Sequence, residues 1–257
     1  MEESKKVKIA ALSAIILVVA LVIVYFIFIR DSGAPELEPS EVVTQESSES
    51  EGEEAVSSES EAIDVLSVEL DKSDGLVREL VGQLSSHPDL ARWLVTEDVI
   101  RKFVAAVDNI ANGHSPRHQI DFFKPGTEFL VEGGPGDFSM DPAGFARYNA
   151  VADVFSSLDS AGTVRLYRQV TPAVQEAYKD LGYPEERFHA SLVRAIDELL
   201  QVPVITGDVL LEEKIKSFAF ADAELEAMSQ AQKHLFRMGP QNVRTIQTKL
   251  RELKTLL

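Results

Sequence analysis

Residues 9–29, IAALSAIILVVALVIVYFIFI, form a run of 21 residues without a charged side chain. A helix of this length rises about 31 Å, enough to cross the hydrocarbon core of a bilayer. The run is too long for a cleavable signal, and Pro35 disfavours cleavage after the small-x-small triplet that precedes it. The sequence therefore predicts a retained transmembrane helix from Ile9 to Ile29, which would bind the membrane.

The charges that flank this run set its predicted orientation. Lys5, Lys6 and Lys8 precede the run, whereas only Arg30 follows it. An excess of Lys and Arg marks the cytoplasmic side of a membrane helix. We therefore expect residues 1–8 to form a short cytoplasmic tail and the rest of the chain to be exported.

Residues 30–62 have the composition of a disordered linker. Positions 31–61 hold eleven acidic residues, no Lys or Arg, two prolines and no aromatic residue. Such a segment buries too little apolar surface to offset the entropy of ordering. As a flexible coil it would span about 30 Å. It serves either as a spacer or as an acidic docking tail for a basic partner.

The charge balance and the absence of cysteine exclude several classes of function. The net charge of −17 divides into +2 for residues 1–30, −11 for 31–61 and −8 for 62–257. An acidic exported domain lacks the basic face that nucleic acids require, so we expect no nucleic-acid partner. Without cysteine, the chain has no disulfide, no thiol nucleophile and no cysteine metal site.

Residues 63–257 predict one mainly α-helical domain. Apolar residues recur at helical spacing through most of this region. In the second half of the domain, proline, glycine and capping residues separate the helices. The expected helix starts are at Ser73, Pro88, Thr96, Asp141, Asp159, Thr171, Phe188, Asp222 and Pro240, with a break expected at Ser229. At the third start we expect Thr96 to cap the helix, with Glu97 and Asp98 in its first turn.

Between residues 112 and 146 the helical period disappears, and ten of these 35 residues are glycine or proline. Residues 127–132 and 137–140 flank the turn residues 133–136, which predicts a small β-hairpin. Short extended segments are also expected between residues 202 and 222. The predicted fold class is therefore mainly α, with a small β-hairpin and short extended segments, preceded by a transmembrane helix and a disordered linker.

No motif predicts catalysis, a cofactor or a metal. His114 and His118 have the i, i+4 spacing of a helical metal site, but Pro116 makes a helix there unfavourable. The adjacent acid pairs, such as those at 97–98 and 185–186, do not converge on one helix face. There is no G-x-S-x-G motif and no G-K-[ST] phosphate loop.

Aromatic residues gather near the glycine-rich segment and suggest a binding groove. Its candidate residues are Phe122, Phe129, Phe138, Arg147 and Tyr148. These side chains either pin a loose loop to the core or line a groove for an extended peptide or glycan. On the groove hypothesis, exchange of Arg147 and Tyr148 for alanine would remove partner binding and leave the fold intact.

The C-terminal region is basic within an otherwise acidic domain. Between Lys233 and Lys254 there are six Lys or Arg residues and one Glu. Some of these cations complement helix C-termini, and the others are available to an anionic partner or to the acidic linker of the same chain.

Six blocks of sequence, in consistent order over residues 70–257, resemble the bacterial domain of unknown function three thousand and fourteen. They are LDKSDGLVREL (70–80), WLVTEDVIRKFVAAVDNI (93–110), DPAGFARY (141–148), EAYKDLGYP (176–184), FADAELE (220–226) and AQKHLFRMGPQN (231–242). The resemblance implies a short anchored protein of a Gram-negative inner membrane. It brings no established activity and no functional residues.

We therefore expect a single-pass inner-membrane protein that exposes a helical domain, residues 63–257, to the periplasm. The preferred function is a non-enzymatic binding or scaffolding module for an envelope protein or a cell-wall polymer. The alternative is an enzyme, such as a hydrolase, that acts on an envelope substrate.

Overall fold

The structure is a computed structural model that describes residue 66 and residues 69–120, 127–215 and 217–257. The chain divides into two units, Ser58–Glu213 with Phe218–Leu257, and Met1–Ser57 with Lys214–Ser217. The predicted transmembrane helix and acidic linker lie outside the described residues. In the part of the chain that is described, no helix is long and apolar enough to cross a membrane. The account below concerns the first unit.

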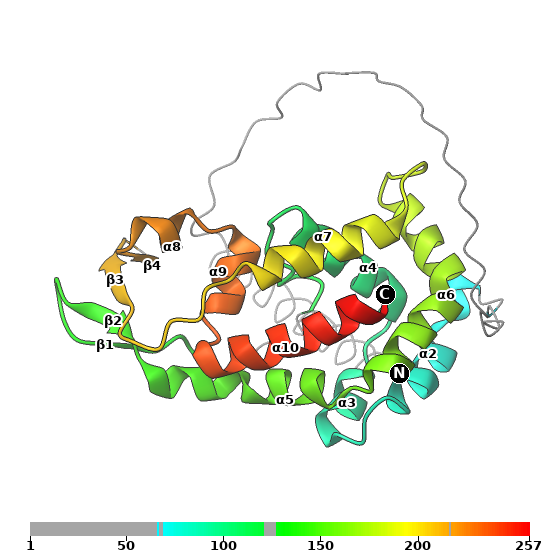
Figure 1. Cartoon of the computed structure of the whole chain (residues 1–257), viewed down its shortest axis with the longest axis horizontal. Coiled ribbons are helices and arrows are strands. Elements are labelled where there is room, and N and C mark those ends of the chain that lie inside the picture. The colour runs from blue at the N-terminus through cyan, green and yellow to red at the C-terminus, as the bar shows by residue number, and fades with distance from the viewer. Residues whose placement is uncertain (1–65, 67–68, 121–126, 216) are drawn as a thin grey trace, which may run out of the picture. The chain divides into compact units, whose positions relative to one another are not determined.

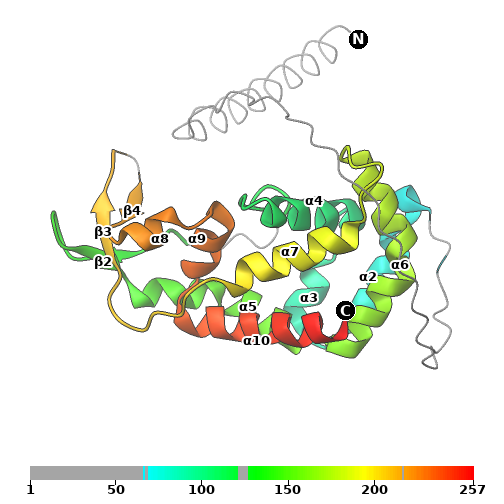
Figure 2. The same cartoon turned by 45° about the horizontal axis from the view of Figure 1, so that its top comes forward.

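This unit is a mainly helical domain with a small antiparallel sheet (Figures 1 and 2). Its helices are η1 (Leu70–Lys72), α2 (Asp74–Gly82), α3 (Pro88–Trp93), α4 (Val99–Ala111), η3 (Pro142–Tyr148), α5 (Asn149–Ser157), α6 (Ser160–Asp180), α7 (Phe188–Leu200), α8 (Ala223–Ala227), α9 (Gln230–Phe236) and α10 (Pro240–Leu256). Its strands are β1 (Val131–Glu132), β2 (Phe138–Met140), β3 (Leu210–Glu213) and β4 (Phe218–Phe220).

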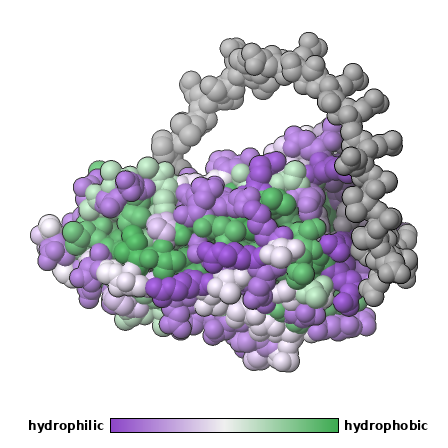
Figure 3. All heavy atoms as spheres, in the orientation of Figure 1, coloured by the Kyte–Doolittle hydropathy of each residue, from purple (hydrophilic) through white to green (hydrophobic). Residues whose placement is uncertain are grey.

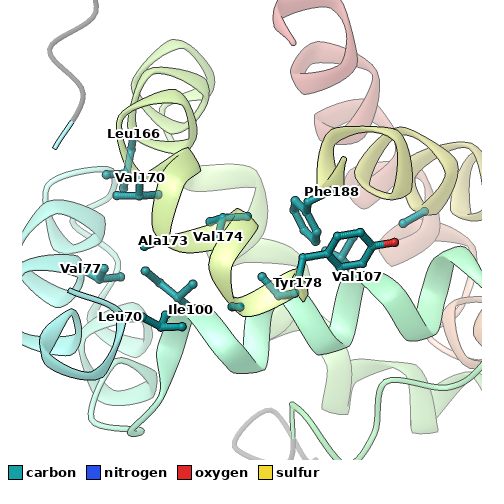
Figure 4. Close-up of a cluster of buried hydrophobic side chains, with 13 residues drawn as sticks. Leu70, Val77, Ile100, Val107, Leu166, Val170, Ala173, Val174, Tyr178 and Phe188 are labelled. Carbon is teal, nitrogen blue, oxygen red and sulfur yellow. The ribbon is translucent and has the colours of Figure 1, made fainter. Parts of the chain in front are cut away.

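The helices enclose two clusters of buried apolar side chains. In the first, α4 packs on α6 and α7, and Figure 4 shows Ile100, Val174 and Phe188 among its members. In the second, α10 packs on α5, α7 and α9 beside the sheet. The adjacent α7 residues Ala195 and Ile196 belong to different clusters. Helix α7 therefore connects the two cores.

The sheet joins segments that are far apart in the sequence. The predicted hairpin is confirmed, because Val131 lies opposite Met140 in an antiparallel pair of β1 and β2. The predicted extended region supplies a second pair, β3 and β4. Phe138 of β2 lies opposite Leu211 of β3, so all four strands form one sheet in the order β1-β2-β3-β4. The sequence predicts the hairpin and the extended segments, but not the pairing of β3 with β2 or with β4.

Two predicted helix starts and one predicted break are confirmed by local caps. The carboxylate of Asp141 accepts the N–H of Ala143 at 2.8 Å, and that of Asp159 accepts the N–H of Gly162 at 3.0 Å. Ser229 caps α9 through a capping box, so the expected break between α8 and α9 is present. These caps can be predicted from the sequence because the acceptor and the donor lie within three residues of one another.

The predicted start of α4 is wrong. The N-cap residue is Asp98, with φ of 55°, so Glu97 and Asp98 precede the helix rather than forming its first turn. The cap comes from α2, where the carboxylate of Asp74 accepts the N–H of Asp98 at 2.8 Å and that of Val99 at 2.9 Å. The hydroxyl of Thr96 instead accepts a hydrogen bond from the ammonium group of Lys102.

Two other local expectations differ from the structure. Ser73 stands at the N-cap of α2, but its hydroxyl donates to the carbonyl of Leu70 at 2.7 Å and caps no N–H group. The expected restart at Thr171 is absent, because α6 continues through Pro172. Ala173 and Val174 are each 2% exposed in the first core. Their burial outweighs the hydrogen bond that the proline removes.

The C-terminal end of α7 is capped by a side chain from α10. Gln247 is 3% exposed, and its amide group donates to the carbonyl oxygens of Leu199 at 3.1 Å and Val202 at 2.8 Å. These bonds satisfy carbonyl groups that lack helical partners. They also fix the start of the segment that leads from α7 to β3, which lines the cavity described below.

Candidate functional site

Three residues of the predicted groove lie together beside η3. The guanidinium carbon of Arg147 lies 5.5 Å from the ring centre of Phe129 and 4.6 Å from that of Tyr148. Its Nη2 donates to the hydroxyl oxygen of Tyr148 at 2.7 Å, and its Nη1 donates to the carbonyl of Thr127 at 3.1 Å. Tyr148 is only 7% exposed. These side chains form a compact aromatic and cationic cluster.

The other two groove residues are not part of this contact. Phe138 lies in β2, where its ring packs edge-on against Phe218 of β4 with 5.2 Å between ring centres. Phe122 lies outside the described residues. Whether the predicted residues bind a ligand therefore stays a prediction.

A half-buried histidine lies close to Arg147. The Nδ1 atom of His234 in α9 is 3.0 Å from the hydroxyl oxygen of Ser115. Burial, together with the positive charges of Arg117, Arg237 and Arg147, lowers the pKa of His234 from 6.5 to about 4. The imidazole is therefore neutral at pH 7, and the positive charges of three guanidinium groups from different segments act on it.

Arg237 follows α9 and is held by an aromatic ring. Its guanidinium carbon lies 4.8 Å from the ring centre of Phe220. Burial lowers the pKa of Arg237, while the negative charge of Glu226 opposes this shift. The Glu226 carboxylate already accepts hydrogen bonds from Lys233 at 2.6 Å and from the N–H of Phe220 at 2.9 Å. Burial raises the pKa of Glu226, but these bonds outweigh it and leave the pKa below its usual value.

A separate cavity of about 350 Å³ opens between η3, the segment from α7 to β3, and the start of α10. Most of its lining is apolar, with Asn149, Asp208 and Asn242 among the polar residues. Figure 3 shows hydrophobic residues in a band that crosses this face over the segment between α7 and β3 and continues between α7 and α10. A cavity of this volume and composition suits a small apolar group.

The turn between α9 and α10 forms one wall of the cavity. Gly239 has φ of 86°, and a Cβ atom there would lie 2.4 Å from the ring of Phe145. Only glycine allows this approach without a shift of the ring. The amide group of Asn242, which is 5% exposed, donates to the carbonyls of Phe145 at 3.2 Å and Met238 at 2.9 Å. Helices η3 and α10 are thereby held together at the cavity.

The cavity and the arginine cluster differ in their chemistry. The cavity lining holds one ionisable side chain, Asp208, and the described lining contains no histidine, serine or lysine. Within the described ranges, no three His, Cys, Asp or Glu residues are grouped as a metal site would require. His114 and His118 are both exposed. The domain therefore has one mainly apolar cavity and one cationic cluster.

The sequence predicts Arg147 together with Phe129 and Tyr148, but it does not predict His234 or Arg237 beside them. His234 and Arg237 lie in the block AQKHLFRMGPQN, together with Gly239 and Asn242 of the cavity wall. The one available signal was that this block begins the basic C-terminal region. Nothing in the spacing connected it with Arg117 or Arg147, which come from segments about 90 or more residues earlier.

Comparison with known proteins gives one match. Residues 99–254 match the family described as Protein of unknown function (DUF3014). This range contains most of the blocks quoted above, but it begins after the block at 70–80. No curated protein and no solved structure matches the chain. Because the matched range covers more than half of the sequence, the chain belongs to the DUF3014 family.

Proposed function

We propose that this protein is a non-enzymatic binding module of the bacterial envelope. In this proposal Ile9–Ile29 anchors the chain in the inner membrane, the N-terminus is cytoplasmic and the domain of residues 63–257 is periplasmic. The length of the apolar run and the three lysines before it support this topology.

The cavity beside η3 is the observation that supports binding best. Its volume of about 350 Å³ and its mainly apolar lining suit one large apolar side chain of a peptide. The first turn of α10 lies at the cavity. The first N–H groups of a helix have no carbonyl partner within it, so those of Gln241 and Asn242 are available to peptide carbonyls. The proposed ligand is therefore an extended segment of an envelope protein.

Photo-crosslinking in cells tests this function. A photoreactive residue at Gln241, which is exposed and lines the cavity, should capture a partner protein that the same residue at exposed Glu176 of α6 does not. Ala146→Trp should reduce the capture because Ala146 is exposed and lines the cavity. Ala143→Trp is the matched control, because Ala143 is exposed on the same helix but is not part of the lining.

Equal capture by the two tryptophan variants would refute the cavity as the binding site. The topology has its own test. Protease added to spheroplasts should digest the domain of residues 63–257, and protection of that domain in intact spheroplasts would refute its periplasmic location.

A further inference from the structure

Three arginines from distant parts of the domain lie near enough to His234 for their charges to act on it. Arg117 lies in the turn after α4, which the contact between Ser115 and His234 holds against α9. Arg147 comes from η3, and Arg237 follows α9. All three guanidinium groups act on the imidazole through their charge. None of these four residues lines the cavity, so the cluster is a second surface.

The fold holds two of these arginines in place before any ligand arrives. Arg147 stacks on Phe129 and Tyr148 and donates to Thr127 and Tyr148. Arg237 stacks on Phe220. A guanidinium group on an aromatic face loses less freedom when it binds an oxyanion than one on an unrestrained side chain. The cluster is thus preorganised for recognition.

The described part of the domain balances the positive charges of the cluster poorly. Among the described residues, no carboxylate forms an ion pair with Arg117, Arg147 or Arg237, and Glu226 pairs with Lys233 instead. The imidazole is neutral. The three arginines and Lys233 are positive and Glu226 is negative, so these described groups have a net charge of about +3. In addition, Nε of Arg147 is buried and has no acceptor. The mutual repulsion of these like charges is unfavourable, and a bound anion would offset it.

From this geometry we infer that Arg117, Arg147, Arg237 and His234 form a binding site for a doubly charged phosphoryl group. Guanidinium groups bind phosphate oxygens in a bidentate manner, and two negative charges offset more of the excess than a single carboxylate does. The group comes either from free phosphate or from the phosphomonoester headgroup of a lipid. The two sources present the same oxygens to the site.

Equilibrium dialysis of the full chain in detergent against radiolabelled inorganic phosphate at pH 7 tests the free source. Arg117→Gln and Arg237→Gln should each weaken binding by about tenfold, the loss expected for one charged hydrogen bond. Arg165→Gln is the matched control, because Arg165 is an exposed arginine of α6 and its exchange removes the same charge. Sedimentation with phosphatidic acid vesicles, against phosphatidylcholine vesicles, tests the lipid source.

Binding in either arm that depends on Arg117 and Arg237 but not on Arg165 supports the site and identifies the source. Failure of both arms overturns it. An equal loss of binding in Arg165→Gln would also overturn it, because it would indicate diffuse electrostatic attraction. Acetate that binds as tightly as phosphate would overturn it as well. Circular dichroism of each variant excludes loss of folding as the cause. Ala146→Trp should leave phosphate binding unchanged, so failure of the cavity proposal and failure of this site are distinguishable.

Discussion

Replacement of Asp74 should destabilise the domain by removing the cap of a helix that begins 25 residues later. Its two carboxylate oxygens accept the N–H groups of Asp98 and Val99 at 2.8 Å and 2.9 Å. Loss of a capping side chain costs about 1 kcal/mol, and loss of a negative charge at a helix N-terminus costs about 0.3–1 kcal/mol. Because two bonds are lost here, we expect Asp74→Ala to lower the free energy of unfolding by about 2 kcal/mol.

Asp74→Asn should lower it by about 1 kcal/mol, because the amide keeps one acceptor oxygen and loses the charge. Thr96→Ala is the control, since Thr96 occupies the position that the sequence predicts as the cap but bonds only to Lys102 through its hydroxyl. Its expected effect is about 0.5 kcal/mol or less. Urea unfolding of the purified chain, followed by circular dichroism, measures all three. Equal effects of Asp74→Ala and Thr96→Ala would refute the cap.

Three further predictions concern the site and its supports. The folded-state pKa of His234 is about 4, below the ordinary value of 6.5. The contribution of the neutral imidazole to stability is therefore present above pH 6.5 and is lost as the pH falls toward 4. The loss amounts to up to about 3 kcal/mol. Urea unfolding at pH 7 and pH 4.5 should therefore show a smaller pH effect in His234→Gln, and an unchanged effect would contradict the shift. Gly239→Ala should lower stability by about 1–3 kcal/mol because its Cβ meets the ring of Phe145, whereas Gly207→Ala, which meets nothing within 4 Å, should be nearly neutral in thermal unfolding. Gln247→Leu should lower stability by about 1–3 kcal/mol by leaving buried carbonyls without donors, and wild-type stability in the same assay would exclude the α7 cap.

The sequence predicted those features whose partners are close along the chain. The caps at Asp141 and Asp159 involve donors two or three residues away. The hairpin of β1 and β2 was recognisable from the glycine-rich turn between its strands. The break at Ser229 has a local cause as well, since its capping box joins residues three apart.

Features that depend on distant partners were not predictable. The cap of α4 comes from Asp74, so the prediction of Thr96 as the cap, which rests on local spacing alone, is wrong. The pairing of β2 with β3 joins residues about 70 positions apart. Likewise, Arg117 and Arg237 act on a common histidine although 120 positions separate them in the sequence. No spacing rule connects such residues before the chain folds.

Burial of Tyr148 changes the expected effect of one pair of exchanges at the site. The sequence led us to expect that alanine at positions 147 and 148 would leave the fold intact. Tyr148 is 7% exposed, and its hydroxyl accepts a hydrogen bond from Arg147. Loss of a buried aromatic side chain costs about 3–5 kcal/mol, so that pair of exchanges would lower stability along with any binding. Ala146, which is exposed at the cavity, is a cleaner position for the test.

Helix α7 gives the domain a property that neither core has alone. Since Ala195 faces one cluster and Ile196 the other, neither cluster can open without disturbing this helix. The slowest-exchanging backbone amides of the two clusters should therefore share one opening free energy, as members of a single cooperative unit. A ligand that binds beside η3 would then protect amides around Val174 of α6 as well, although the two places belong to different clusters.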